Sequence, residues 1–268
     1  MKQGLSFKSF VSLWLVVICS IFTLTCTPVP AHQNAHNNGT IDSASASFEA
    51  TPGPGETTSV VSRKYKKTIE MSKDSAVVVW GTISGQRVVR GSGTYFVHKG
   101  YHIVITAYHV YDDPRIQGAM VQSQEGEMVA GTIVYGDRDR DICVLLVPKM
   151  RTAEAAPLNP IKPAHADEGL SVLYTGFPGH HQHGEPLTLN GTLAGISDHS
   201  GYIIMQSYAW MGSSGSGVFD ERGRYIGVLV AVDVERGPFH PQIQENIVYV
   251  SPIWGINVDE LEDMLEGK

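Results

Sequence analysis

Residues 211–218 read "MGSSGSGV", a cluster of glycines and serines that directly precedes an apolar segment. Clusters of this kind usually form loops or flexible linkers. They also form tight turns that expose one serine hydroxyl and aim backbone N–H groups at a developing oxyanion, a use that requires a histidine and an aspartate elsewhere. The second interpretation therefore depends on whether the remaining sequence supplies these two residues.

The N-terminal residues have the pattern of an export signal. Lys2 and Lys8 precede an uncharged stretch at residues 10–26, "FVSLWLVVICSIFTLTC", and Pro28, Pro30 and Ala31 follow it. A basic segment, an apolar segment and a small-residue site are typical of a secretory signal. An apolar stretch of this length is also at the lower limit for a membrane span. We therefore predict that residues 1–31 are a signal peptide or an N-terminal membrane anchor. The protein is expected to be secreted or periplasmic, or alternatively anchored to the membrane by residues 10–26.

The next segment predicts a linker and then one folded domain. Residues 32–58 are rich in Ala, Ser, Asn, Gly, Thr and Pro and offer little apolar surface to bury. Such a composition is typical of a disordered spacer. We assign residues 32–70 to a disordered linker and residues 71–268 to the folded domain. The chain has 20 Lys and Arg against 27 Asp and Glu and carries no basic patch, which argues against a nucleic-acid partner.

The three cysteines exclude a disulfide framework within the domain. Cys19 and Cys26 lie in the export segment, and Cys143 stands alone in "DICVLLV". A single cysteine has no intramolecular partner. Its apolar neighbours predict that Cys143 is a buried strand residue rather than a nucleophile.

The folded part of the sequence has an all-β pattern. Short segments rich in Val, Ile, Tyr and Thr alternate with Gly, Pro, Asp or Asn, a signature of a sandwich or barrel. The proline-rich residues 147–169 interrupt this series and suit a connector between two halves. At the C-terminus, Val258, Leu261 and Leu265 have helical spacing, so we expect a short docking helix there.

Four motifs occur in a fixed order, each attached to an expected strand: "GSGTYF", "ITAYHV", "DRDICVLLV" and "GSSGSGVFD". Individually, a histidine after a strand or an aspartate in a charged turn says little. Together the motifs resemble the trypsin-like (chymotrypsin-fold) serine proteases, most closely the disulfide-free bacterial branch that includes HtrA-type proteases and glutamyl endopeptidases. The resemblance spans roughly residues 76–253. It implies two antiparallel Greek-key β-barrels, the first holding His109 and Asp141 and the second holding Ser214, with the active site between them.

The resemblance also implies catalytic roles. His109 would accept the proton of the Ser214 hydroxyl, and Asp141 would orient and stabilise the imidazole. The N–H groups of Gly212 and Ser214 would form the oxyanion hole. Two departures from the family are visible. Its common "GNSGGP" reads "GSSGSG" here, and only thirteen residues follow Gly255, so we expect no PDZ module of the kind that HtrA-type proteins carry.

The expected substrate-binding wall contains small and apolar residues. In this fold the pocket for the residue before the scissile bond would be lined by four side chains, those of Ser207, Tyr208, Val230 and Val232. None of these four side chains offers a carboxylate for Lys or Arg, or a cation for Glu. An unpaired buried charge is costly. We therefore expect preference for a small or medium aliphatic residue.

The last candidates concern metals and an alternative function. His180, His181 and His183 share the segment "FPGHHQHGEP", but no acidic or cysteine partner is spaced to complete a metal site. A surface loop is favoured, and no metal or cofactor is expected. The sequence thus predicts an exported serine endopeptidase that acts on protein or peptide substrates. The alternative is an inactive protease fold that binds a peptide or another protein.

Overall fold

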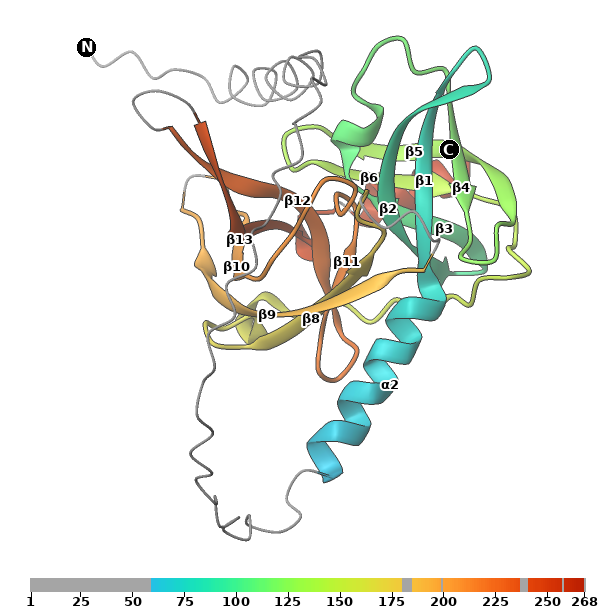
Figure 1. The fold of residues 1–268 in the computed structure, drawn as a ribbon. Helices are drawn as coiled ribbons and strands as arrows, with labels where there is room; N and C mark the ends of the chain where they lie inside the picture. Colours follow the sequence, from blue (N-terminus) through green and yellow to red (C-terminus); the bar gives the residue numbers. More distant parts are fainter. Residues whose placement is uncertain (1–58, 180–184, 199, 237–240, 257, 268) are drawn as a thin grey trace, which may run out of the picture. The chain divides into compact units, whose positions relative to one another are not determined.

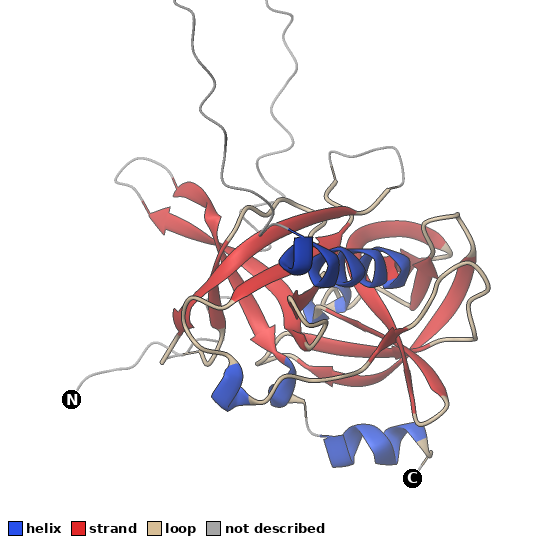
Figure 2. Ribbon diagram, turned by 90° about the horizontal axis from the view of Figure 1, so that it is seen from below, coloured by secondary structure: helices blue, strands red, loops and turns tan. Residues whose placement is uncertain are grey.

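The computed structural model describes residues 59–179, 185–198, 200–236, 241–256 and 258–267. Within these ranges strands are the main regular structure, as Figure 2 shows. The strands form two barrels, labelled along the chain in Figure 1. The predicted signal or anchor, residues 1–31, and the three histidines at 180, 181 and 183 lie outside the described residues.

The first barrel closes through pairing of its first two strands. Its ring order is β1-β4-β5-β6-β3-β2, and β1 also pairs with β2. The strands are β1 (Ala76–Ile83), β2 (Gln86–His98), β3 (Tyr101–Thr106), β4 (Gly118–Gln122), β5 (Met128–Asp137) and β6 (Ile142–Leu146). A short β7 (Ala156–Pro157) adds to β2 in parallel. Because β1, β2 and β3 are neighbours and β4 returns beside β1, the barrel has a Greek-key order.

The second barrel repeats this order. It closes as β10-β13-β12-β11-β8-β9, so β11 returns beside β8 just as β4 returns beside β1. The strands are β8 (Ser171–Gly176), β9 (Leu187–Ile196), β10 (Ile203–Gln206), β11 (Gly217–Asp220), β12 (Tyr225–Arg236) and β13 (Pro241–Pro252). The prediction of two antiparallel Greek-key barrels is confirmed.

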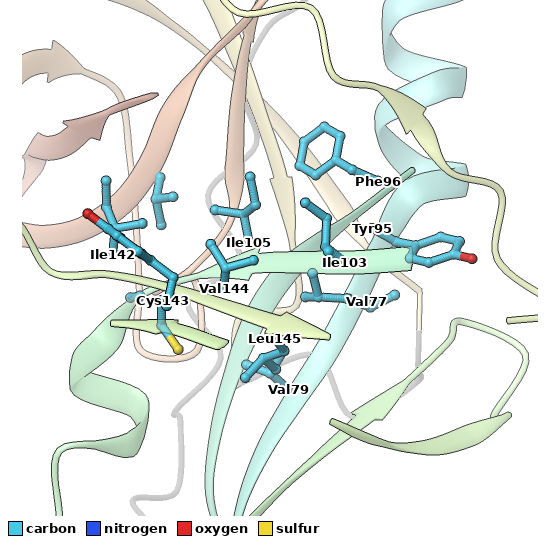
Figure 3. Close-up of a cluster of buried hydrophobic side chains, with 14 of the residues drawn as sticks. Val77, Val79, Tyr95, Phe96, Ile103, Ile105, Ile142, Cys143, Val144 and Leu145 are labelled. Atoms are coloured by element: carbon cyan, nitrogen blue, oxygen red, sulfur yellow. The ribbon is translucent and has the colours of Figure 1, made fainter. Parts of the chain in front are cut away.

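Alternating side chains of the strands fill the barrel interiors. Figure 3 shows the cluster in the first barrel, where Val77, Val79, Ile103 and Val144 are among the buried residues. Cys143 lies in the same cluster, is fully buried and has no disulfide partner among the described residues. Burial, with the nearby charge of Asp141, raises the pKa of its thiol to about 12. The prediction that Cys143 is a buried strand residue is confirmed, and its thiol stays protonated at neutral pH.

The connector and the C-terminal helix also match the sequence. Residues 147–169 link β6 to β8 and contain β7 and the short 3-10 helix η2 (Pro163–His165). At the other end, a further 3-10 turn, η3 (Ile253–Gly255), leads to α3 (Val258–Leu265). Leu261 and Leu265 of α3 are buried in the core of the first barrel.

The start of the folded part differs from the expectation. Helix α2 (Ser59–Ser75) begins twelve residues before Met71, within the segment assigned to the linker, and leads directly into β1 (Figure 1). Its inner face follows i, i+3, i+4, i+7 spacing and consists of Tyr65, Thr68, Ile69 and Ser72. Three of these residues form hydrogen bonds through hydroxyls: Tyr65 OH donates to Asn190 Oδ1, Thr68 Oγ1 donates to Glu221 O at 3.1 Å, and Ser72 Oγ lies 2.7 Å from Thr175 Oγ1. Half of the residues on the packed face are polar, which explains why the sequence of this segment resembles that of a linker.

No helix in the described part of the chain is long and apolar enough to cross a bilayer.

Candidate active site

His109 and Asp141 meet at one end of the first barrel. His109 follows β3 in the 3-10 turn η1 (Tyr108–Tyr111), and Asp141 directly precedes β6. The Nδ1 of His109 lies 2.7 Å from Asp141 Oδ2, and the backbone N–H of His109 donates to Asp141 Oδ1 at 2.7 Å. Both carboxylate oxygens are therefore occupied by the same residue, which fixes the imidazole ring in position.

The backbone around Asp141 contributes to this geometry. Asp141 has φ 57°, in the left-handed region that short polar residues tolerate better than most. Its carbonyl accepts from Tyr108 N at 3.2 Å, so the aspartate is held beside η1. From the second barrel, Ser251 Oγ donates to Arg140 O at 2.5 Å. The aspartate turn is thus held by both barrels.

The charge environment of His109 favours its protonated form. Burial acts to lower the pKa of His109, but the charge of Asp141, their hydrogen bond and the charge of Asp112 together raise it above 6.5. The His109 side chain is 26% exposed and that of Asp141 is 14% exposed. The imidazole thus combines a raised basicity with access to solvent.

Ser214 lies in the glycine-rich turn between β10 and β11, and two glycines in that turn cannot be replaced without strain. Gly212 has φ +92° and Gly215 has φ +91°, a region that L-residues avoid. A Cβ on Gly215 would lie 1.9 Å from Ser92 O, and one on Gly212 would lie 2.8 Å from Phe177 O. The turn at residues 211–218 is thus shaped by close backbone approach and is not a flexible linker.

The turn leaves two N–H groups available. The carbonyl of Met211 accepts from Gly179 N at 2.6 Å. Because C=O and N–H point in opposite directions across a trans peptide, the N–H of Gly212 points away from Gly179. Neither Gly212 N nor Ser214 N donates to an acceptor among the described residues, whereas Ser213 N donates to Trp210 O at 2.9 Å. This alternation leaves donors at the two positions that the sequence predicts.

The first barrel reaches across to Ser214 through the Gly91–Ser92 segment of β2. Ser92 N donates to Ser214 O at 2.7 Å, and Ser92 Oγ donates to Gly212 O at 2.7 Å. A Cβ built on Gly91 would lie 2.8 Å from Val110 Cγ2 and 3.0 Å from the Ser214 carbonyl oxygen. Ser214 and Val110, the residue after His109, therefore both lie close to Gly91. No hydrogen bond joins the Ser214 hydroxyl to the His109 ring in the described part of the chain.

The chain is similar to known proteins in sequence and in fold. A family model described as "Trypsin-like peptidase domain" matches residues 91–228, more than half of the chain. The chain belongs to this family. Among solved structures, the serine endoprotease from Yersinia pestis matches with a TM-score of 0.58 and 18% sequence identity, over 75% of this chain. The match covers 66% of the Yersinia chain, so about a third of that protease lies outside it. No curated protein matches the chain in sequence.

Ser92 is a residue of this trypsin-like peptidase whose part in the site the sequence did not reveal. It is fully buried, and besides binding Gly212 O its hydroxyl accepts from Phe177 N at 2.8 Å. Thr106 Oγ1 in turn donates to Ser92 O at 2.7 Å. The motif "GSGTYF" marked this strand, but the contact crosses from one barrel to the other and has no local signal.

The expected substrate wall of the peptidase is only partly free. Ser207 is buried and its hydroxyl already donates to Asn190 O at 2.9 Å, so it supports the wall rather than offering a hydroxyl. Tyr208 is 58% exposed. On β12, Val230 is buried and Val232 is half-buried, and Val232 lies opposite the fully buried Val248 of β13. Val232 also packs against the hydrophobic core of the second barrel, which contains Val248.

The described residues hold no group of three or more His, Cys, Asp or Glu arranged to bind a metal ion.

Proposed function

We propose that this trypsin-like peptidase is an active serine endopeptidase that cleaves peptide bonds through an acyl-enzyme on Ser214. The observation that carries the proposal is the His109–Asp141 pair set against a glycine turn with two available N–H groups. Protein or peptide chains are the substrates. Export through residues 1–31, with anchoring by residues 10–26 as the alternative, belongs to the same proposal.

The first chemical step transfers a proton to His109. Asp141 holds Nδ1 as the protonated nitrogen, which leaves Nε2 to accept the proton of the Ser214 hydroxyl. Ser214 Oγ attacks the carbonyl carbon, and the N–H groups of Gly212 and Ser214 stabilise the resulting oxyanion. One such donor is worth about 2.7 to 4 kcal/mol in the transition state. His109 then donates its proton to the leaving amine, and water repeats the sequence on the acyl-enzyme.

Labelling with a fluorophosphonate probe, followed by mass mapping, tests the proposal. An active enzyme is expected to carry the label on Ser214 alone. The inactive, peptide-binding alternative predicts no label on a folded protein. Localisation is tested separately by fractionating the expressing cells and determining the N-terminus of the protein by mass spectrometry.

The pH profile of kcat/KM is expected to follow the protonation of His109. Protonated imidazole cannot act as a base, so activity should be absent at low pH and rise as His109 loses its proton. Because the pKa of His109 is raised, the midpoint should lie above 6.5. The measurement is kcat/KM for a peptide substrate from about pH 5 to about pH 9.

Asp112 provides the control for this profile. Asp112→Asn removes one of the charges that raise the pKa of His109 without touching its hydrogen bonds. The midpoint should move to lower pH while activity above it remains. A midpoint below 6.5 in the unaltered protein would contradict the assignment of His109 as the base.

Cleavage is expected after small or medium aliphatic residues. Val232 and Val248 face each other beside the expected pocket, and none of the four expected wall residues carries a charge that could pair with Lys, Arg or Glu. Preference for Val, Ala, Leu or Ile should appear in a peptide-library cleavage profile. Val232→Gly should enlarge the pocket and increase cleavage after Phe relative to Val by about tenfold or more. A profile dominated by Lys, Arg or Glu would refute this assignment.

A further inference from the structure

Two arginines on β2 lie together without a carboxylate partner. The guanidinium carbons of Arg87 and Arg90 lie 4.7 and 5.6 Å from the centre of the Trp80 ring. Neither arginine forms an ion pair with an acid of the described chain, although acidic residues outnumber basic ones. Five other arginines do have such a partner: Arg115, Arg138, Arg140, Arg151 and Arg224.

A β-bulge brings the two arginines to one face. Arg90 pairs with Trp80 across the β1–β2 ladder, and Arg87 pairs with Thr82, with the register shifting between Gly81 and Thr82. Residues three apart on a regular strand point to opposite faces, but one extra residue at a bulge restores the same face. The ring beneath them is fixed, because Trp80 Nε1 donates to Gln122 Oε1 at 3.1 Å.

The guanidinium group of Arg90 also lacks one of its possible hydrogen bonds. Its Nε is enclosed by protein and has no hydrogen-bond partner among the described residues. Burial lowers the pKa of its guanidinium. The Trp80 ring offsets part of the cost of removing this charge from water, but a ring face supplies no acceptor in the plane of the N–H groups. A carboxylate does, because it matches the planar fork of arginine with two parallel hydrogen bonds.

The arginine pair lies next to the turn that carries Ser214. Arg90 and Ser92 are two residues apart on β2 and so share a face, about 7 Å apart, and Ser92 Oγ binds Gly212 O. Trp80 packs with Val78 against Phe177, whose carbonyl lies beside Gly212. The Trp80 ring and the two guanidinium groups therefore lie on the first barrel, next to the turn that carries Ser214.

The arginine pair lies on the side of Ser214 where we expect the substrate residues after the scissile bond, which form the leaving half. Gly215 N donates to Leu229 O of β12, whereas Ser92 N of β2 donates to Ser214 O. Ser214 is thus bound to β2 of the first barrel, and its neighbour Gly215 is bound to β12 of the second. The residue before the scissile bond is expected on the β12 side, so the residues after it extend over β2. This step rests on the proposed function.

We propose that Arg87 and Arg90, supported by Trp80, form a binding site for a carboxylate on the leaving half of a peptide substrate. The carboxylate belongs to an Asp or Glu side chain after the scissile bond or to a nearby C-terminus. The site selects substrates on the opposite side of Ser214 from the aliphatic pocket.

The test compares matched quenched-fluorescence peptides. All share one acyl half and differ in Glu or Gln at each of the first three positions after the scissile bond, with an amidated C-terminus. A further peptide with Gln at these positions and a free C-terminal carboxylate distinguishes the second source. We expect kcat/KM for one carboxylate-bearing peptide to exceed that for its neutral counterpart by about tenfold. Arg87→Gln combined with Arg90→Gln should abolish this ratio, and Arg90→Glu should reverse it in favour of the neutral peptide.

Arg222→Gln is the matched control. Arg222 is an exposed arginine in the β11–β12 turn, at the far end of β11 from Ser214, and the ratio should be unchanged in this variant. No preference for a carboxylate at any position, or a preference that survives the double substitution, would overturn the site.

Binding to the Ser214→Ala protein, measured by fluorescence anisotropy of the same peptides, separates this proposal from the proposed function. Carboxylate-dependent binding that is lost in the double variant supports the site even if the unaltered protein cleaves nothing. Cleavage and probe labelling without carboxylate preference would refute the site and leave the peptidase assignment standing.

Discussion

Ser214→Ala is expected to lower kcat for peptide hydrolysis by roughly 10⁶-fold, the scale of losses on removing a catalytic serine. Alanine has no oxygen to attack the carbonyl carbon, so no acyl-enzyme can form. The oxyanion donors are backbone N–H groups and remain in place, which leaves a small residual rate. The measurements are single-turnover and steady-state hydrolysis, with fluorophosphonate labelling read by mass. Labelling should disappear completely.

Ser216→Ala is the matched control within the same turn. Ser216 is fully buried and its hydroxyl has no hydrogen-bond partner among the described residues, so its removal should leave labelling intact. Ser214 is only half-buried, and its replacement should leave the thermal unfolding midpoint nearly unchanged. Hydrolysis near the original rate in Ser214→Ala would show that another group is the nucleophile. Cys143 is a poor candidate, because burial keeps its thiol protonated.

The two barrels could be predicted because the sequence pattern of each strand is local. β-Branched and aromatic residues between turn residues predict each strand, and His109, Asp141 and Ser214 each lie next to such a strand. The order of the motifs then gives the order of the strands. The glycine-rich sequence of the turn also indicates the positive φ angles of Gly212 and Gly215.

The remaining features depend on contacts between distant segments. Helix α2 was missed because Thr68 and Ser72 occupy its buried face, and only their partners at Glu221 and Thr175 show that they are packed. Ser92 joins the site by crossing between barrels. Arg87 and Arg90 share a face only because the ladder shifts by one residue. Sequence periodicity reports none of these, since each is decided by tertiary packing.

Asp141→Asn is expected to lower kcat by roughly 10⁴-fold while leaving KM within a few-fold. Asp141 accepts from both the backbone N–H and Nδ1 of His109. An amide has only one acceptor oxygen, and its NH₂ group would face a ring nitrogen that must itself carry a proton. The ring is then driven to the tautomer with its proton on Nε2, where it cannot accept the proton of Ser214. The measurement is kcat and KM for one peptide at a pH above the midpoint of the unaltered protein.

Asp139→Asn separates loss of this carboxylate from a general effect on the turn. Asp139 lies two residues earlier, its side chain is exposed, and its carbonyl rather than its carboxylate accepts from Tyr202 OH. This variant should retain kcat within a few-fold. Loss of the Asp141 charge should also lower the pKa of His109, because that charge raises it, so the residual activity of Asp141→Asn should have its midpoint at lower pH. Equal losses in the two variants would mean that the turn, and not the Asp141 carboxylate, sustains catalysis.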